Sequence, residues 1–208
     1  MIIEAVRTAS RFALPAMAAM LAASVSTGCQ RKVHDLTTVR GAYAAYVEVA
    51  ESGRYEEMFP LLVPELQQQI ATTHANLRTT RELIERYYPP ELKRQALADI
   101  GPEKVRLAAT PAAYFAARVD ESHRYALSLG EKLGSLIKRI DEIPKDSGRF
   151  QVVTVSGAKL DFYKGPTRVS VVLSKDDIEG ILRESRRSAE MLANVQSLVK
   201  TLSGGSHR

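Results

Sequence analysis

Acidic, hydroxyl and imidazole side chains provide the first candidates for chemistry in this chain. The run Asp120-Glu121-Ser122-His123 places the residue types of a hydrolase triad in consecutive positions. On a helix, consecutive side chains point about 100° apart, so such a run does not bring nucleophile, base and orienting acid together. We therefore interpret these residues as one solvated face of a helix.

The histidines do not suggest a metal site. His34, His74, His123 and His207 are widely separated in the sequence, and no two have the short spacing with which a helix presents metal ligands. The sequence also contains no glycine-rich loop of the phosphate-binding type. We expect neither a metal nor another cofactor.

Carboxylates occur in adjacent pairs that could in principle do acid–base work. These pairs are Glu56-Glu57, Asp141-Glu142 and Asp176-Asp177. Each is more simply a surface charge or a helix-end charge, because no second partner is suggested by the spacing. Asp161 and Tyr163 alternate on one face of an expected strand, and we interpret them as a solvent-facing row. The sequence therefore predicts a protein that is not an enzyme.

Cys29 is the only cysteine, and the sequence before it is unlike that around a catalytic thiol. Arg7 and Arg11 precede the apolar stretch 12–25, which only Pro15 and Ser24 interrupt. This stretch is too short to span a membrane as a mature helix. A charged start, a short apolar core and small residues together predict a secretory signal.

The motif Ser26-Thr27-Gly28-Cys29 resembles the lipobox of bacterial lipoproteins, although that family usually has Leu where this chain has Ser26. The resemblance implies cleavage after Gly28 and a diacylglycerol on Cys29, followed by acylation of the new amino group. Gln30, in place of Asp, favours the outer membrane facing the periplasm over the inner membrane. The alternatives are a plain secretory signal, cut after Ser24 or Gly28, and an uncleaved anchor.

Composition limits the partners of the remaining chain. Residues 1–28 contain Arg7, Arg11 and Glu4, so their removal lowers the net charge from +5 to +4. No dense basic run with interleaved aromatic residues is present, and we expect no nucleic-acid partner. With Cys29 lipidated the chain has no thiol left for a disulfide, so its stability must come from packing.

Hydrophobic periodicity predicts an α+β domain that is predominantly helical. About five helices are expected, over Thr37 or Thr38 to Gly53, Arg54–Leu62 (a short helix or a turn), Pro64–Tyr88, Glu91–Ile100 and Thr110–Ile143. Alternating runs predict a three-stranded antiparallel meander, over Phe150–Ser156, Ala158–Tyr163 and Arg168–Leu173. Ser174 then caps a final helix with an apolar stripe that includes Leu182 and Ala189. The predicted organisation is a signal peptide (1–28), a lipidated tether (29–36), one globular domain (37–202) and a flexible tail (203–208).

The segment from Arg40 to Phe59, followed by Leu-Leu-Val-Pro-Glu-Leu, resembles the opening helices of small lipoproteins in the cone-shaped superfamily of ketosteroid isomerase and nuclear transport factor two. The resemblance implies helices packed on a curved antiparallel sheet, sometimes around an apolar pocket. It transfers no catalytic residue.

Two functions remain as expectations. The first is a non-enzymatic domain, held at the membrane by the lipid on Cys29, that binds another envelope protein or component through helix faces or a sheet edge. The alternative is a small-ligand pocket protein, suggested by the cone-type resemblance and by Tyr43, Tyr46, Tyr87 and Tyr88. Such tyrosines more often fill the edges of a core.

Overall fold

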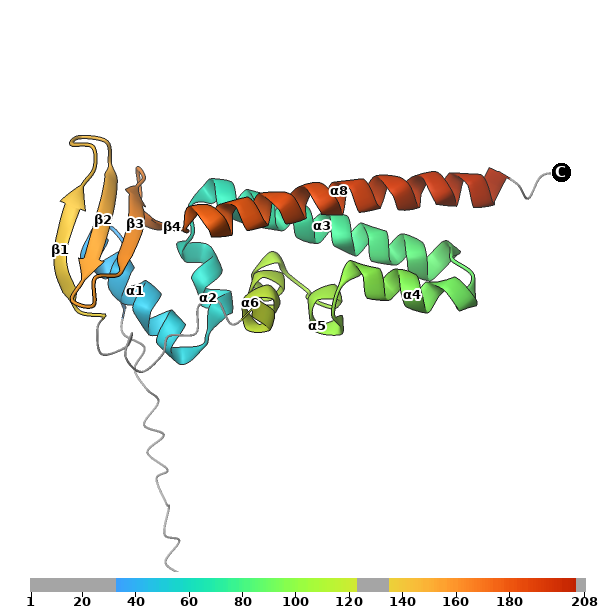
Figure 1. Cartoon of the computed structure of the whole chain (residues 1–208), viewed down its shortest axis with the longest axis horizontal. Helices are drawn as coiled ribbons and strands as arrows, with labels where there is room; N and C mark the ends of the chain where they lie inside the picture. The colour runs from blue at the N-terminus through green and yellow to red at the C-terminus, as the bar shows by residue number, and fades with distance from the viewer. Residues whose placement is uncertain (1–32, 123–134, 205–208) are drawn as a thin grey trace, which may run out of the picture. The chain divides into compact units, whose positions relative to one another are not determined.

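The computed structural model describes residues 33–122 and 135–204, which form seven α-helices, one 3-10 helix and a four-stranded sheet (Figure 1). The chain divides into two units, Met1–Val33 and His34–Arg208, and all the described elements belong to the second. The helices are α1 (Val39–Ser52), α2 (Tyr55–Met58), η1 (Phe59–Leu61), α3 (Pro64–Tyr87), α4 (Pro90–Ile100), α5 (Glu103–Arg106), α6 (Pro111–Ser122) and α8 (Lys175–Gly204). The prediction of a mostly helical α+β domain is confirmed.

Helix α1 has the limits that its sequence predicts. The Thr38 side chain accepts a hydrogen bond of 3.1 Å from the Gly41 amide, which caps the first turn. Gly53 ends the helix in the left-handed conformation, with φ of 66°. Tyr43 and Tyr46 are buried on the face of α1 that packs into the core, so both fill the core as expected.

Helix α3 is the central element of the helical part. It begins at Pro64, whose missing N–H costs nothing in the first turn, and it ends before Pro89. Its buried face, with Ile70 and Ile84 among its members, packs against α8 along much of its length. It also contacts α4, so α4 and α8 both pack on the same helix.

The sheet has four antiparallel strands in the order β1-β2-β3-β4, one more than predicted. The strands are β1 (Ile137–Glu142), β2 (Arg149–Thr154), β3 (Lys159–Lys164) and β4 (Val169–Val172). The last three are the predicted meander. Ser174 accepts a hydrogen bond of 3.2 Å from the Asp177 amide and thereby caps α8, also as predicted.

The prediction of one long helix from Thr110 to Ile143 is wrong, because Ile137–Glu142 is strand β1. The register of β1 on β2 shifts between Ile137 and Arg139, which marks a bulge. Ile137 and Ile140 both pack against the core as a result, although they are three residues apart. A spacing of three is typical of a helix, and this produced the error. Gly130 and Gly134, which the same expectation placed inside a helix, lie outside the described residues.

The inner face of the sheet packs against α1 and the turns that follow it. Val152 and Phe162 of the sheet, and Met58 and Leu62 of the helical segment, have 0 % of their surface exposed. The ring of Tyr43 meets that of Phe162 edge-on, with centroids 6.3 Å apart. The space between the sheet and α1 is therefore filled by side chains.

Candidate functional site

Two adjoining hollows lie along one side of α8, and together we call them the α8 groove. The first has a volume of about 570 Å³ and lies among α3, α6 and α8. The second, of about 410 Å³, lies among α3, α4 and α8. Arg187 and Met191 line both hollows, so the two adjoin along α8.

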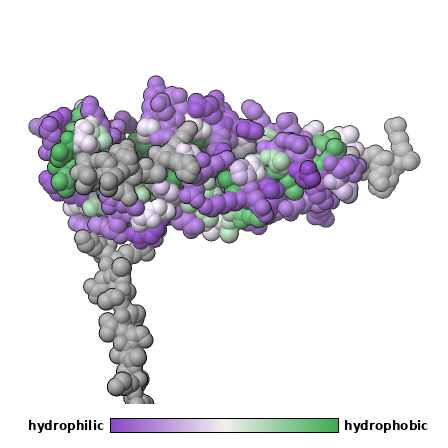
Figure 2. Space-filling model, turned by 60° about the horizontal axis from the view of Figure 1, so that its bottom comes forward, coloured by the Kyte–Doolittle hydropathy of each residue, from purple (hydrophilic) through white to green (hydrophobic). Residues whose placement is uncertain are grey.

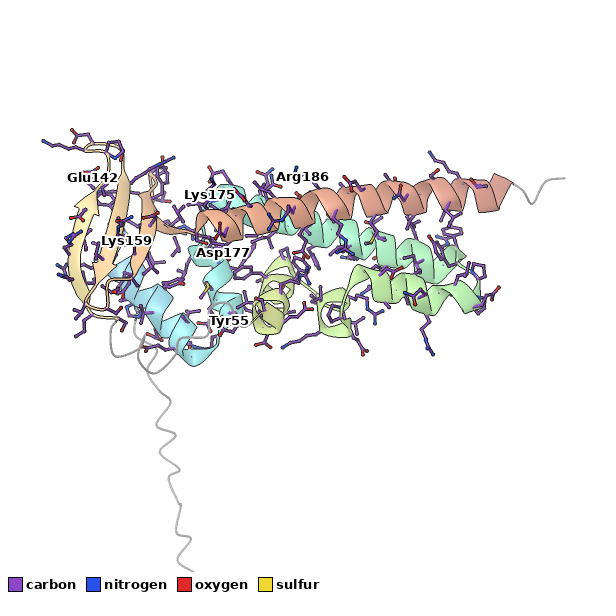
Figure 3. All side chains as sticks on the ribbon, in the orientation of Figure 1. Tyr55, Glu142, Lys159, Lys175, Asp177 and Arg186 are labelled. Atoms are coloured by element: carbon purple, nitrogen blue, oxygen red, sulfur yellow. The ribbon has the colours of Figure 1, made fainter. Side chains whose placement is uncertain are left out.

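The residues that α8 contributes to this groove repeat every three or four positions. They are Asp177, Gly180, Ile181, Arg183, Glu184, Arg187, Glu190, Met191, Asn194, Val195 and Leu198. From Asp177 to Leu198 the groove follows α8 for about 31 Å at the rise of an α-helix. In Figure 3, Asp177 lies on the side of α8 toward α6, whereas Arg186 lies on the opposite side. One face of α8 therefore lines the whole groove.

The groove combines an apolar floor with polar walls. Leu77, Phe115 and Val119 are buried side chains of the first hollow, and Ile84 and Val195 are buried side chains of the second. In the space-filling view, apolar patches lie among polar surface over the helical part of the domain (Figure 2). Such a lining is typical of sites that bind amphipathic partners or ligands.

A polar network of one buried tyrosine and three partly exposed charged side chains forms one wall of the first hollow. The Tyr114 hydroxyl donates a hydrogen bond of 2.7 Å to Glu184 Oε1. The Arg118 guanidinium forms an ion pair with Glu184 and another with Glu121, the latter with an N–O distance of 2.8 Å. Helices α6 and α8, distant in the sequence, are thus joined by charge-assisted bonds.

The electrostatics of this network fix its protonation states. Burial and the negative charge of Glu184 raise the pKa of the Tyr114 phenol, which therefore stays protonated as a donor. Burial lowers the pKa of the Arg118 guanidinium. The charge and hydrogen bond of Glu184, together with the other partners, have the larger combined effect, so the pKa is raised overall. Each of these groups has a partner already, so the network orients side chains and offers no activated nucleophile.

Arg187 differs from Arg118, because it has no ion-pair or hydrogen-bond partner within residues 33–122 and 135–204. It is exposed and stands where the two hollows meet. Asp99 and Glu190 line the second hollow beside it. The groove therefore offers an unpaired cation at its middle and carboxylates toward its α4 end.

The described part of the triad-like run, Asp120-Glu121-Ser122, lies in the last turn of α6, and each side chain has its own partner. Asp120 forms an ion pair with Lys104, and Glu121 forms one with Arg118. The Ser122 hydroxyl donates a hydrogen bond of 3.1 Å to the Val119 carbonyl. His123 lies outside the described residues. Glu121 and Ser122 also line the first hollow, which the sequence interpretation did not anticipate.

The histidines that the structure describes are separate from one another. His34 Nε2 lies 2.7 Å from Glu48 Oε2. His74 is buried, with Nε2 2.9 Å from the Ala108 carbonyl oxygen, while His207, like Cys29, lies beyond the described part. Within residues 33–122 and 135–204, no group of three or more His, Cys, Asp or Glu side chains could hold a metal ion.

The acidic pairs have structural partners. Glu57 pairs with Arg54, Asp141 with Arg139, and Asp177 accepts 2.6 Å from the Ser174 hydroxyl. Asp161 accepts 2.9 Å from Gln151, and Tyr163 is 42 % exposed, so their strand face is solvated as expected. Tyr88, by contrast, lines the second hollow.

Sequence reasoning missed the residues that make the groove polar, above all Arg118, Glu184 and Arg187. The sequence of α8 contains one indication of them. Glu184 and Arg187 occur at helical spacing between the apolar residues Ile181 and Met191, so they interrupt an apolar stripe. Charged residues in an otherwise apolar helical stripe often mark a polar interface.

Within the described segments, no helix has both the length and the apolarity to cross a membrane. Comparisons of the chain with protein family models, with curated proteins and with solved structures found no match.

Proposed function

We propose that this chain is a bacterial lipoprotein, anchored through a lipid on Cys29 in the outer membrane and facing the periplasm. Its folded domain binds another protein of the envelope and catalyses no reaction. The observation that carries the binding role is the α8 groove, with its apolar floor and its unpaired Arg187.

The anchor is supported by the sequence Ser26-Thr27-Gly28-Cys29 after a short apolar core. Two or more acyl chains hold a protein stably at a membrane, whereas one does so only marginally. Cys29→Ala should therefore leave an unacylated precursor that is lost from the membrane fraction when the envelope is fractionated. Unchanged processing and retention of that variant would overturn the proposed anchor.

The dimensions of the groove favour a helix as the bound element. It follows α8 for about 31 Å, which matches roughly twenty residues of a second helix. Helix α3 already contacts α4 and α8, and another helix laid in the groove would contact all three, as in a helical bundle. An amphipathic helix binds such a groove through apolar residues spaced three and four apart.

Arg187 and Arg186 provide a matched pair for testing this role. Both are exposed arginines of α8, but only Arg187 lines the groove. A photo-crosslinking side chain at Leu198 should yield one discrete adduct in the native envelope. Arg187→Glu should abolish that adduct, while Arg186→Glu should leave it unchanged. Equal yields from the two variants would show that the adduct does not depend on the groove.

A small amphipathic ligand is the second candidate, because the first hollow has the volume of ordinary ligand sites and polar groups at one wall. An environment-sensitive fluorescent amphiphile should then bind the purified domain saturably, and Arg187→Glu should weaken the binding of an anionic probe. Non-saturating fluorescence would exclude this candidate and leave the protein partner.

A further inference from the structure

The two hollows of the α8 groove adjoin between charged residues on opposite walls. On one wall, Arg187 of α8 lines both hollows. On the other wall, Ile100 of α4 lines the first hollow and Asp99 lines the second, so the C-terminal end of α4 lies at the same junction. Glu190, about one helical turn after Arg187, lines the second hollow. Basic and acidic side chains therefore mark the middle of the groove from opposite sides.

These three charged residues are open to a partner, because none of them neutralises another. Arg187 and Glu190 have a spacing of three on α8, at which helical ion pairs often form, yet no ion pair joins them. Asp99 accepts a hydrogen bond of 3.0 Å from Gln95, but it has no basic partner in the part of the chain that the structure describes. All three residues are exposed. A bound molecule could therefore contact each of them without breaking an existing ion pair.

The main chain strengthens the contrast between the two walls. Asp99 lies in the last turn of α4, where the carbonyl end of a helix carries a partial negative charge. The side chain and the helix end thus both favour a cation on the α4 wall. Arg187 lies in the middle of α8, far from either end of that helix, so its guanidinium alone makes the α8 wall positive at the junction.

Apolar residues continue on both sides of this junction. Leu77 and Phe115 are buried residues of the first hollow, and Ile84 and Val195 are buried residues of the second. A helix that lies along the groove would therefore place apolar side chains against the floor at both of its ends. Only its middle would meet open charges.

We infer that the α8 groove selects a helix of another protein that carries a mixed-charge pair at its middle. Its carboxylate contacts Arg187, and its basic side chain, about one turn away, contacts Asp99 and Glu190. This inference rests on the proposed function, in which the groove binds an amphipathic helix. Charges across an interface contribute mainly to specificity, because a wrong partner places like charges together. Arg187, Asp99 and Glu190 are thus specificity-determining residues, while the apolar floor supplies most of the affinity.

A set of synthetic helices tests this selection. Each has about twenty residues and the same apolar stripe, and only two central positions differ. These positions, one turn apart beside the stripe, hold Glu and Lys, two Glu or two Lys. Fluorescence anisotropy with the purified full-length protein should show the tightest binding for the Glu/Lys helix, by about five- to ten-fold at low salt. Salt at about 1 M should remove most of this difference.

Charge reversals assign the preference to the groove. Arg187→Glu makes all three positions acidic, so the preference should move to the two-Lys helix. Asp99→Lys combined with Glu190→Lys makes all three basic, and the two-Glu helix should then bind best. Arg186→Glu changes the net charge of α8 by the same amount outside the groove, so the Glu/Lys helix should remain the tightest ligand.

The possible outcomes separate this inference from the proposed function. Equal affinities for the three helices, or equal shifts in preference from Arg186→Glu and Arg187→Glu, would overturn the inference and leave the helix-binding function in place. Failure of all three helices to bind the parent protein would overturn both. A dimer of the parent protein that Arg187→Glu dissociates, measured by sedimentation equilibrium, would show that the groove holds a second copy of this chain in place of another protein.

Discussion

Asn76 of α3 donates a hydrogen bond of 3.2 Å to the hydroxyl of Ser188 on α8, in a seam where Ser188 is only 1 % exposed. The Ser188 hydroxyl in turn donates 2.7 Å to the Ser185 carbonyl. One turn away, the Ser185 hydroxyl donates a hydrogen bond of 3.2 Å to the side-chain oxygen of Gln69 on α3. The two longest helices are therefore joined by small hydroxyl side chains as well as by apolar packing.

Ser188→Leu should destabilise the domain, because the seam has no room for a larger side chain. Overpacking of this kind costs typically about 1–3 kcal/mol. The free energy of unfolding, measured by urea titration and circular dichroism, should fall accordingly. Ser197→Leu, at an exposed position of the same helix, is the control and should change stability by less than about 0.5 kcal/mol. Equal effects from the two variants would show that the seam is not tightly packed.

The polar seam also explains why the predicted stripe of α8 was partly wrong. Leu182 is 39 % exposed and Ala189 is exposed, although both belonged to the expected core-facing line. The line that actually faces α3 passes through Ser185, Ser188 and Val195. A sequence pattern places serine on the surface. Here Ser185 and Ser188 can face the interior because Gln69 and Asn76 of α3 form hydrogen bonds with their hydroxyl groups.

Phe162 and Tyr163 are adjacent on β3 and occupy opposite faces of the sheet. Phe162→Ala should lower the free energy of unfolding by about 3–5 kcal/mol, because it leaves a cavity against Tyr43. Tyr163→Ala should cost within about 1 kcal/mol, since that ring is 42 % exposed. Urea unfolding of both variants measures the difference, and comparable losses would contradict the assignment of the inner face.

The sequence predicts the alternation of inward and outward side chains that separates these two residues. It also predicts the helix caps at Thr38 and Ser174. Each depends on neighbours within a few positions, where local geometry decides the structure. Strand β1 was not readable, because its bulge places Ile137 and Ile140 at helical spacing. The α8 groove depends on α3, α4, α6 and α8 meeting in space, and no local pattern contains that information.

Tyr46 should make the domain less stable at alkaline pH. Burial, aided by the charge of Asp177, raises its pKa from 10.0 to about 12. Below pH 10 the phenol is neutral in both states; between pH 10 and 12 only the unfolded state ionises, so stability falls as pH rises. A shift of this size corresponds to about 2–3 kcal/mol by pH 12.

The measurement is urea unfolding of the parent protein and of Tyr46→Phe at several pH values between 8 and 12. The difference in free energy between the two proteins should be constant below pH 10 and should change above it, as the variant loses this part of the pH dependence. A difference that stays constant up to pH 12 would show that Tyr46 ionises as easily in the fold as in the unfolded chain.

Gly41→Ala should release the start of the chain from the domain and leave the core folded. The methyl group would occupy the position of the Asp35 carbonyl, so Leu36 would move away from β4. The Val169 amide, whose acceptor is the Leu36 carbonyl, should then exchange its hydrogen much faster. The Phe162 amide, in the middle of the same sheet, should keep its protection and serve as the internal control. Val169 protection equal to that of the parent protein would show that the glycine is not needed for the contact, and faster exchange at both amides would show a general loss of stability instead.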